Sequence, residues 1–151
     1  MGSCGQAHAS CHVGHHDPET RAAGVVVLHH ISFSVADLQR SAWFYDAVLG
    51  TLGLARVWTR DTAVGYGHPD AEDQFAIKLV AELAQTPGPG FHLAFAAPDR
   101  NSVGAFHRAA LLHGGRDNGA PGLRPGYGPH YFAAFVIDPD GHRIEAVHDQ
   151  E

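Results

Sequence analysis

The sequence predicts an α+β domain in which the same succession of elements occurs twice. Each half begins with an apolar strand, continues through an amphipathic helix that ends at two glycines, and closes with further strands. A Pro/Gly-rich linker at residues 86–90 separates the halves. We therefore expect one domain over residues 25–151, built of two modules at residues 25–84 and 90–149, with residues 1–24 as a flexible tail.

The first module opens at residues 25–35, which are apolar at first and then alternate, as expected for a strand. Asp37 is placed to cap a helix that Gly50 and Gly53 end. Residues 54–59, 63–66 and 74–81 are predicted to be strands.

The second module repeats this order with a strand at residues 91–97 and a helix opened by Asp99 and ended by Gly114 and Gly115. Residues 117–129 are rich in Gly and Pro and are predicted to be a loop. The turn Asp138-Pro139-Asp140-Gly141 then joins two apolar runs, which predicts a terminal β-hairpin.

Composition narrows the class of protein. The chain has 151 residues with a formal net charge of -6, and no cluster of Lys or Arg, which argues against a nucleic-acid or anionic-membrane partner. No apolar run approaches the roughly 18 residues needed to span a bilayer, and the first residues do not read as a signal peptide. Both cysteines, Cys4 and Cys11, lie in the tail, so we expect no disulfide framework and a cytoplasmic protein.

Histidine is unusually frequent, with 13 residues. Four of them lie in the Cys/His-containing tail at positions 8–16, where a soft metal could bind, but the Gly, Ala and Ser content gives no pattern that would preorganise such a site and favours a flexible tail.

The repeat places four candidate functional residues at matching positions. His30 and His92 lie on the first strands, 62 residues apart (92 − 30), and Lys78 and Glu145 lie on the last strands. If the modules pair about a pseudo-twofold axis, these four side chains converge. Two imidazoles and a carboxylate suit a divalent metal and leave positions open for a substrate. His29 is the rival to His30, since adjacent strand residues face opposite sides; each residue taken alone is equally compatible with a surface or core position.

Three stretches of the chain carry a family resemblance: Leu28-His29-His30-Ile31-Ser32-Phe33-Ser34-Val35, Gly90-Phe91-His92-Leu93-Ala94-Phe95 and Asp138-Pro139-Asp140-Gly141-His142-Arg143-Ile144-Glu145. Together they resemble the vicinal oxygen chelate superfamily, which includes glyoxalase I, extradiol dioxygenases, fosfomycin-resistance thiol transferases and bleomycin-resistance proteins. The resemblance implies two paired βαβββ modules that form a cupped mixed sheet, the glyoxalase-like fold. It also implies a metal held by His30, His92 and Glu145, and a homodimer.

The chain departs from this pattern at Lys78, since four-ligand glyoxalase I has a glutamate on this strand. A lysine there is cationic and would repel a metal unless its pKa fell sharply. The two-histidine, one-glutamate set resembles the thiol transferases and dioxygenases more closely, and Ser32 matches a hydroxyl of the former. We therefore take Lys78, Ser32 and Glu145 as candidate catalytic residues.

Candidate substrate-binding residues lie on the second strand and in the predicted loop. Trp58 could line the cup, Arg124 could bind an anion, and Tyr127 and Tyr131 could stack on a ligand or bond to it, with residues 117–131 as a gate. A solvated loop is the alternative.

These observations predict a divalent-metal-dependent enzyme that acts on a small oxygen-rich substrate by lyase, isomerase, thiol-transferase or dioxygenase chemistry. The metal could be Zn, Ni, Mn or Fe, and it would stabilise developing oxyanion charge. The alternative is a metal-free drug- or metabolite-binding protein of the bleomycin-resistance kind.

Overall fold

The computed structural model describes residues 27–80, 82 and 86–151. The predicted tail, with Cys4, Cys11 and its histidines, lies outside the described residues.

Eight strands and two helices follow one another in the described part of the chain. Their bounds are β1 Ile31–Val35, α1 Leu38–Gly50, β2 Ala55–Arg60, β3 Ala63–Gly67, β4 Phe75–Leu79, β5 Leu93–Ala96, α2 Arg100–Leu112, β6 Arg116–Leu123, β7 Tyr131–Ile137 and β8 Arg143–Asp149. We call β1 to β4 with α1 module 1, and β5 to β8 with α2 module 2. The α+β class and the two βαβββ modules are confirmed.

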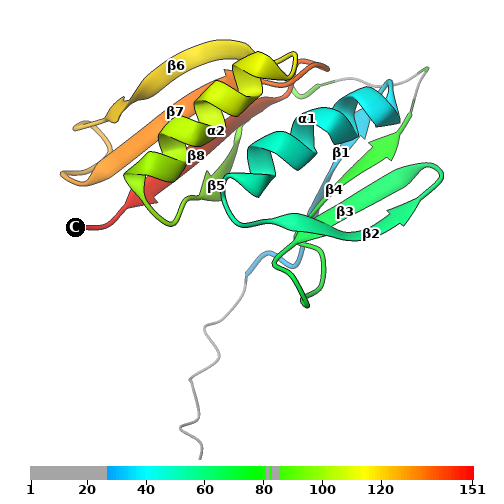
Figure 1. The fold of residues 1–151 in the computed structure, drawn as a ribbon. Coiled ribbons are helices and arrows are strands. Elements are labelled where there is room, and N and C mark those ends of the chain that lie inside the picture. Colours follow the sequence, from blue (N-terminus) through cyan, green and yellow to red (C-terminus); the bar gives the residue numbers. More distant parts are fainter. Residues whose placement is uncertain (1–26, 81, 83–85) are drawn as a thin grey trace, which may run out of the picture.

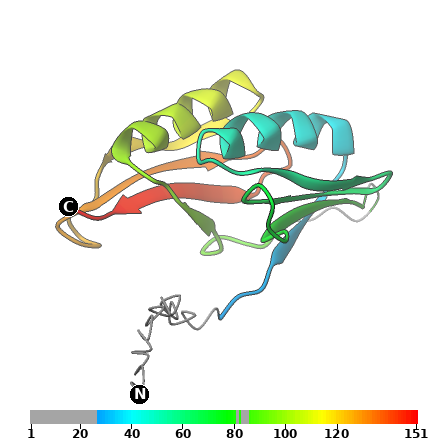
Figure 2. The ribbon, with the colours of Figure 1, turned by 60° about the horizontal axis from the view of Figure 1, so that its bottom comes forward.

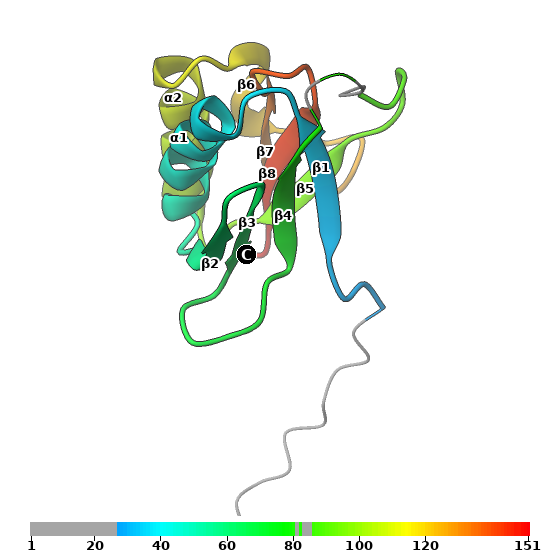
Figure 3. The ribbon, with the colours of Figure 1, turned by 90° about the vertical axis from the view of Figure 1, so that its right-hand side faces the viewer.

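Each module contains one four-stranded mixed sheet, in the orders β1-β4-β3-β2 and β5-β8-β7-β6. The first and last strands of each module pair in parallel, and the remaining pairs are antiparallel. Both helices lie side by side over the same side of the sheets (Figure 1), as the turned views also show (Figures 2 and 3). We call the sheet surface that faces away from the helices the open face of each module.

A single apolar core lies between the helices and the sheets. Helix α1 buries Phe44 and Val48 in it, and α2 buries Phe106, while Phe33 and Ile144 contribute from the strands. The helices begin in the same way in both modules, because Asp37 accepts a hydrogen bond from the Arg40 backbone N–H (3.0 Å) and Asp99 accepts one from that of Ser102 (2.7 Å). None of the helices in the described residues is long and apolar enough to cross a membrane.

The turn before β8 joins the two modules. The carboxylate of Asp140 accepts hydrogen bonds from the backbone N–H of Ala36 (2.9 Å), from Arg40 Nη2 (2.8 Å) and from Ser41 Oγ (2.8 Å). All three donors lie at the start of α1, where the helix dipole also favours a negative charge. Asp140 of module 2 therefore fixes the first turn of the helix of module 1.

Asp138 forms a second link between the modules. Its Oδ1 accepts the backbone N–H groups of Asp140 and His142, and its Oδ2 accepts the Tyr45 hydroxyl at 2.6 Å. Burial raises the pKa of Asp138, and burial together with the nearby carboxylate raises the pKa of Tyr45 well above its usual value. His142 donates through Nε2 to the backbone carbonyl of Ser34 at 2.7 Å and stacks on Phe33. This turn is thus part of the core as well as a hairpin connection.

Two sequence expectations need correction. The first strand begins at Ile31, so of the predicted residues 25–35 the described residues 27–30 are not strand, and β5 likewise begins after His92. The predicted loop at residues 117–129 is mostly strand, because β6 covers residues 116–123 and pairs with β7 through two register shifts. Its Gly and Pro residues are tolerated because β6 lies at the edge of the sheet, where a missing N–H breaks no ladder.

Candidate metal-binding site

The open face of module 2 carries a buried carboxylate. Ile144 and Ala146 of β8 face the core, so Glu145 between them points to the open face, yet it is only 1% exposed. The Tyr131 hydroxyl donates to Glu145 Oε1 at 2.6 Å, and His92 Nε2 lies 3.0 Å from Glu145 Oε2. Three polar side chains from β7, β8 and the residues before β5 therefore meet at this point.

The second oxygen of Glu145 has no hydrogen-bond donor among the described residues, although it is buried. A buried carboxylate oxygen without a donor is costly unless a cation compensates it. His92 Nε2 lies close to this oxygen without forming a hydrogen bond of good geometry, and the His92 side chain is 48% exposed. The two donor atoms thus lie beside each other, one on a buried and one on a half-exposed side chain, and this donor set fits a divalent metal.

Tyr131 keeps its proton in this arrangement. Burial and the hydrogen bond to Glu145 raise the pKa of Tyr131 to about 12. The phenol therefore donates at neutral pH and holds one oxygen of Glu145, leaving the other oxygen free. The sequence singled out Tyr131 as a substrate contact; its contact with Glu145 is one that the sequence pattern did not show.

Two further predicted substrate-binding residues lie beside this pair. The guanidinium of Arg124 lies 5.5 Å from the ring centre of Phe135, which itself lies 6.3 Å from the ring centre of His92. Arg124 also donates to the backbone carbonyl of Ala120 at 2.6 Å, so its position is set by β6. Tyr127 is 72% exposed and contacts the ring of Tyr131 edge-on. Arg124, Tyr127 and Tyr131 are therefore brought together around His92 and Glu145.

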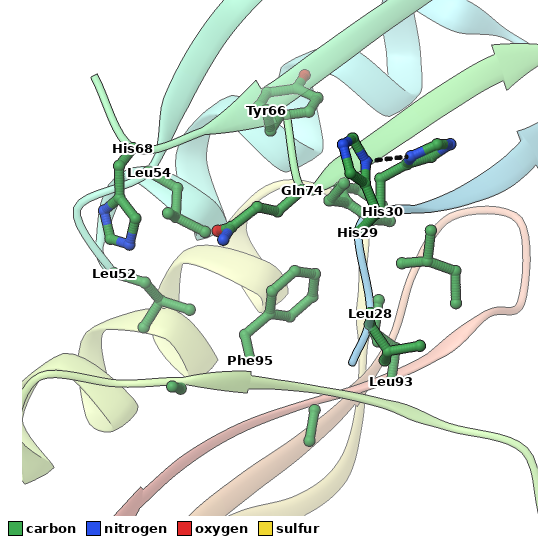
Figure 4. Close-up of a pocket in the computed structure, with 14 residues that line it drawn as sticks. Leu28, His29, His30, Leu52, Leu54, Tyr66, His68, Gln74, Leu93 and Phe95 are labelled. Carbon is green, nitrogen blue, oxygen red and sulfur yellow. Dashed lines mark hydrogen bonds between the residues drawn. The ribbon is translucent and has the colours of Figure 1, made fainter. Parts of the chain in front are cut away.

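His30 does not join them within the chain. Its Nδ1 lies 2.9 Å from Nδ1 of His29, and both rings line a cavity of about 230 Å³ whose other walls include Leu54 and Phe95 (Figure 4). Among the described residues, no three His, Cys, Asp or Glu side chains lie close enough together to hold a metal ion. Within one chain His92 and Glu145 therefore meet, and His30 lies apart.

The prediction that Lys78 and Glu145 occupy corresponding positions in the two modules is wrong. Strand β1 pairs with β4 so that Ile31 lies opposite Phe75, and β5 pairs with β8 so that Leu93 lies opposite Ile144. Since His30 and His92 immediately precede Ile31 and Leu93, the two modules superpose in this register. The residue that corresponds to Glu145 is then Ala76. Lys78 corresponds to Val147, two residues further along the strand.

The other predicted residues lie on the open face of module 1. Ser32 lies opposite Ala76, and Lys78 is exposed beside Ser34. Trp58 lies opposite Gly65, and its Nε1 donates to Asp73 at 2.9 Å. Ser32, Lys78 and Trp58 therefore share one face, which within the chain is separate from the Glu145 site. Sequence reasoning did not single out Asp73.

The fold is similar to several solved structures. A glyoxalase/bleomycin resistance protein from Albidiferax ferrireducens T118 is 33% identical with a TM-score of 0.72, over 83% of this chain and 100% of that one. A glyoxalase-related enzyme from Fulvimarina pelagi is 22% identical with a TM-score of 0.63, over 80% and 86% of the two chains. Glyoxalase I from Zea mays is 23% identical with a TM-score of 0.62, over 80% of this chain and 45% of that one. The last two show a similar fold only.

Sequence comparison leads to the same family. No curated protein matches this chain. The profile of the Glyoxalase/Bleomycin resistance protein/Dioxygenase superfamily matches residues 27–146, which include every strand and helix from β1 to β7 and the first part of β8. With the two paired βαβββ modules and the similarity to the Albidiferax protein, this match shows that the chain belongs to the glyoxalase/bleomycin resistance protein/dioxygenase superfamily.

Proposed function

We propose that this protein is a divalent-metal-dependent enzyme that acts on a small oxygen-rich substrate. Its metal would be held by His92 and Glu145 of one copy and by His30 of a second copy. The observation that carries the proposal is the buried Glu145, whose Oε2 has no donor and lies 3.0 Å from the half-exposed His92.

A second copy supplies what one chain lacks. His30 and His92 occupy equivalent positions in the two modules, but a single chain keeps them apart. Strands β1 and β5 are both at the edge of their sheets, and such edges are usually covered or paired in the folded assembly. A symmetric homodimer that apposes module 1 of one copy to module 2 of the other brings His30 to the His92–Glu145 pair twice.

The ligand set favours a particular branch of the superfamily. Ala76 occupies the position of module 1 that corresponds to Glu145, where a fourth ligand would lie. The proposed ligands of this chain are therefore His30, His92 and Glu145 only. That set resembles the three-ligand members more than four-ligand glyoxalase I. A bound divalent metal would supply Lewis-acid polarisation of substrate oxygens.

The residues of the chain prepare this chemistry. Tyr131 holds Oε1 of Glu145 and so orients the carboxylate. The ring of Phe135 lies edge-on to that of His92, with 6.3 Å between the ring centres. Arg124 and Tyr127 lie around the same site and are proposed to bind the substrate, while Ser32 would offer a hydroxyl from the apposed module.

Metal content tests the proposal directly. The protein is purified, dialysed and analysed for metals by mass spectrometry, and about one divalent ion per chain is expected. Glu145→Gln and His30→Ala each should lose the ion, because each removes one ligand and Gln keeps the shape of Glu. His29→Ala is the matched control, since it removes the neighbouring imidazole and is expected to keep the metal.

Mixing two variants tests whether the site is shared between copies. His30→Ala and Glu145→Gln are unfolded together and refolded as a mixture. In a symmetric dimer each heterodimer contains one intact site, so about a quarter of the wild-type metal should return. No recovery would show that His30 and Glu145 act within one chain or not at all. If the wild-type protein holds no metal but binds drugs or metabolites, the alternative of a metal-free binding protein is correct.

A further inference from the structure

The open face of module 1 carries two cations in one row. The strand register places Arg60 opposite Ala63, Ala63 opposite Lys78, and Lys78 opposite Ser34. On β3, Val64 follows Ala63 and is buried in the core. Because side chains alternate along a strand, Ala63 and its row neighbours point to the open face. Arg60 and Lys78 therefore point to the same side, with only the small Ala63 between them.

Arg60 is held in place by the aromatic residue beside it. The Trp58 indole lies directly on Gly65, so a Cβ at this position would overlap with the ring. The indole Nε1–H donates to Asp73 at 2.9 Å, and the Arg60 guanidinium carbon lies 5.1 Å from the centre of the indole ring. The guanidinium is thus positioned by a cation–π contact on a fixed ring.

Neither Arg60 nor Lys78 has a carboxylate within 4.0 Å in the described part of the chain. By contrast, Arg56 on the same strand pairs with Asp46 at 2.6 Å. Strand β3 lies between Arg60 and Lys78, so their Cα atoms are about 10 Å apart, which long side chains can bridge onto one group. In a protein of net charge -6, this is a local concentration of uncompensated positive charge.

We propose that Arg60 and Lys78 form an anion-binding subsite above Ala63 that takes a carboxylate or phosphate group. A guanidinium and an ammonium are the side chains that bind such groups through charge-assisted hydrogen bonds. In the neighbouring row the Trp58 indole covers Gly65 and Ala76 is buried, so the indole borders the subsite on that side. The subsite itself does not depend on the proposed function. Its assignment to the substrate does rest on that function, in which module 2 of a second copy would carry the metal beside this face.

Lys78 makes the subsite measurable, because it is the only lysine of the chain. The full-length protein is treated with an amine-reactive succinimidyl ester, and acylation of Lys78 is followed by peptide mapping, separately from the α-amino group. The rate is measured with increasing inorganic phosphate, with succinate, and with chloride at matched ionic strength. Protein as purified and protein treated with a chelator are compared, so that the result does not depend on whether a metal binds.

Saturable slowing of Lys78 acylation by phosphate or by succinate, absent with chloride, is the expected result, and the more protective anion identifies the group that the subsite prefers. In Arg60→Gln the anion concentration for half-protection should rise about ten-fold, the effect of losing one charge-assisted contact. Arg108→Gln, at an exposed arginine of α2, is the matched control and should leave protection unchanged. Equal slowing by all three salts, or unchanged protection in Arg60→Gln, would overturn the proposal. Retained protection of Lys78 in Glu145→Gln, after that variant has lost its metal, would support the subsite as independent of the metal.

Discussion

The two modules share one arrangement of strands but present open faces of opposite chemical character. Module 2 places the carboxylate of Glu145 and the ring of His92 together, with Tyr131 bonded to the carboxylate. Module 1 has Ala76 where module 2 has Glu145, and carries Lys78 and Arg60 on the same face. The backbone repeat therefore sets where side chains lie, and the residue types at a few matching positions set what each face binds.

The helices behind these faces differ in a related way. Tyr45 and His107 are 62 residues apart (107 − 45), the same interval that separates Asp37 from Asp99, so they occupy equivalent helical positions. Tyr45 donates to Asp138 in the other module, whereas His107 contacts Asp117 in its own module at 2.9 Å and lowers the pKa of that carboxyl. The hydrogen bond of Tyr45 thus joins module 1 to the turn before β8, whereas that of His107 lies within module 2.

Removing Asp140 should loosen the packing of module 2 against module 1. We expect this change to have the largest effect on stability. Asp140→Ala leaves the buried Ser41 hydroxyl and the Ala36 N–H without their acceptor and removes the partner of Arg40. The free energy of unfolding, measured by urea denaturation, should fall by about 3 kcal/mol.

Asp37→Ala is the control for this change, because Asp37 caps the same helix through the Arg40 N–H of its own module. It should cost about 1 kcal/mol. Equal losses in the two variants would show that Asp140 acts only as a second helix cap and does not join the modules.

Much of this arrangement follows from local sequence pattern. The caps Asp37 and Asp99, the alternation in the last strand and the Asp138–Gly141 turn were sufficient to predict two modules and to place Glu145 on the face away from the core. Contacts between distant segments were not predictable in this way. Nothing near Asp140 in sequence indicates that its partners lie in residues 36–41, because that contact depends on how the modules pack.

The error at Lys78 has a simple cause. Side chains alternate along a strand with a period of two residues, so a shift of two residues keeps a side chain on the same face. Ala76 and Lys78 are therefore indistinguishable by pattern, and only the pairing with β1 separates them. Residues 117–123 were misread for a different reason: Gly119, Pro121 and Gly122 are typical of loops, yet they form an irregular edge strand.

The difference between Ala76 and Glu145 suggests an experiment that would make the two modules alike. Ala76→Glu should tighten divalent-metal binding about ten-fold, because it adds a carboxylate at the position that corresponds to Glu145. Affinity is measured by competition with a chromogenic chelator.

Lys78→Glu is the matched control, since it adds the same carboxylate on the same face two residues away. It should not reproduce the gain in affinity if the register assigned to β4 is correct. A larger gain in Lys78→Glu than in Ala76→Glu would show that the fourth-ligand position lies at residue 78.

The difference between Tyr45 and His107 predicts how stability depends on alkaline pH. The pKa of Tyr45 is raised by burial and by Asp138, so its phenol stays neutral in the folded protein at a pH of about 10, where the phenol of the unfolded chain ionises. The stability that this group contributes is complete below pH 10 and is lost as the pH rises further. In Tyr45→Phe the unfolding free energy should be lower at pH 9, because Asp138 loses a donor, but its fall between pH 9 and pH 11 should be smaller by about 1 kcal/mol.

Tyr127→Phe, at an exposed tyrosine, is the control and should show the same fall as the parent protein. If urea denaturation at the two pH values gives Tyr45→Phe and the parent equal falls, the contact between Tyr45 and Asp138 does not keep the phenol protonated in the folded state.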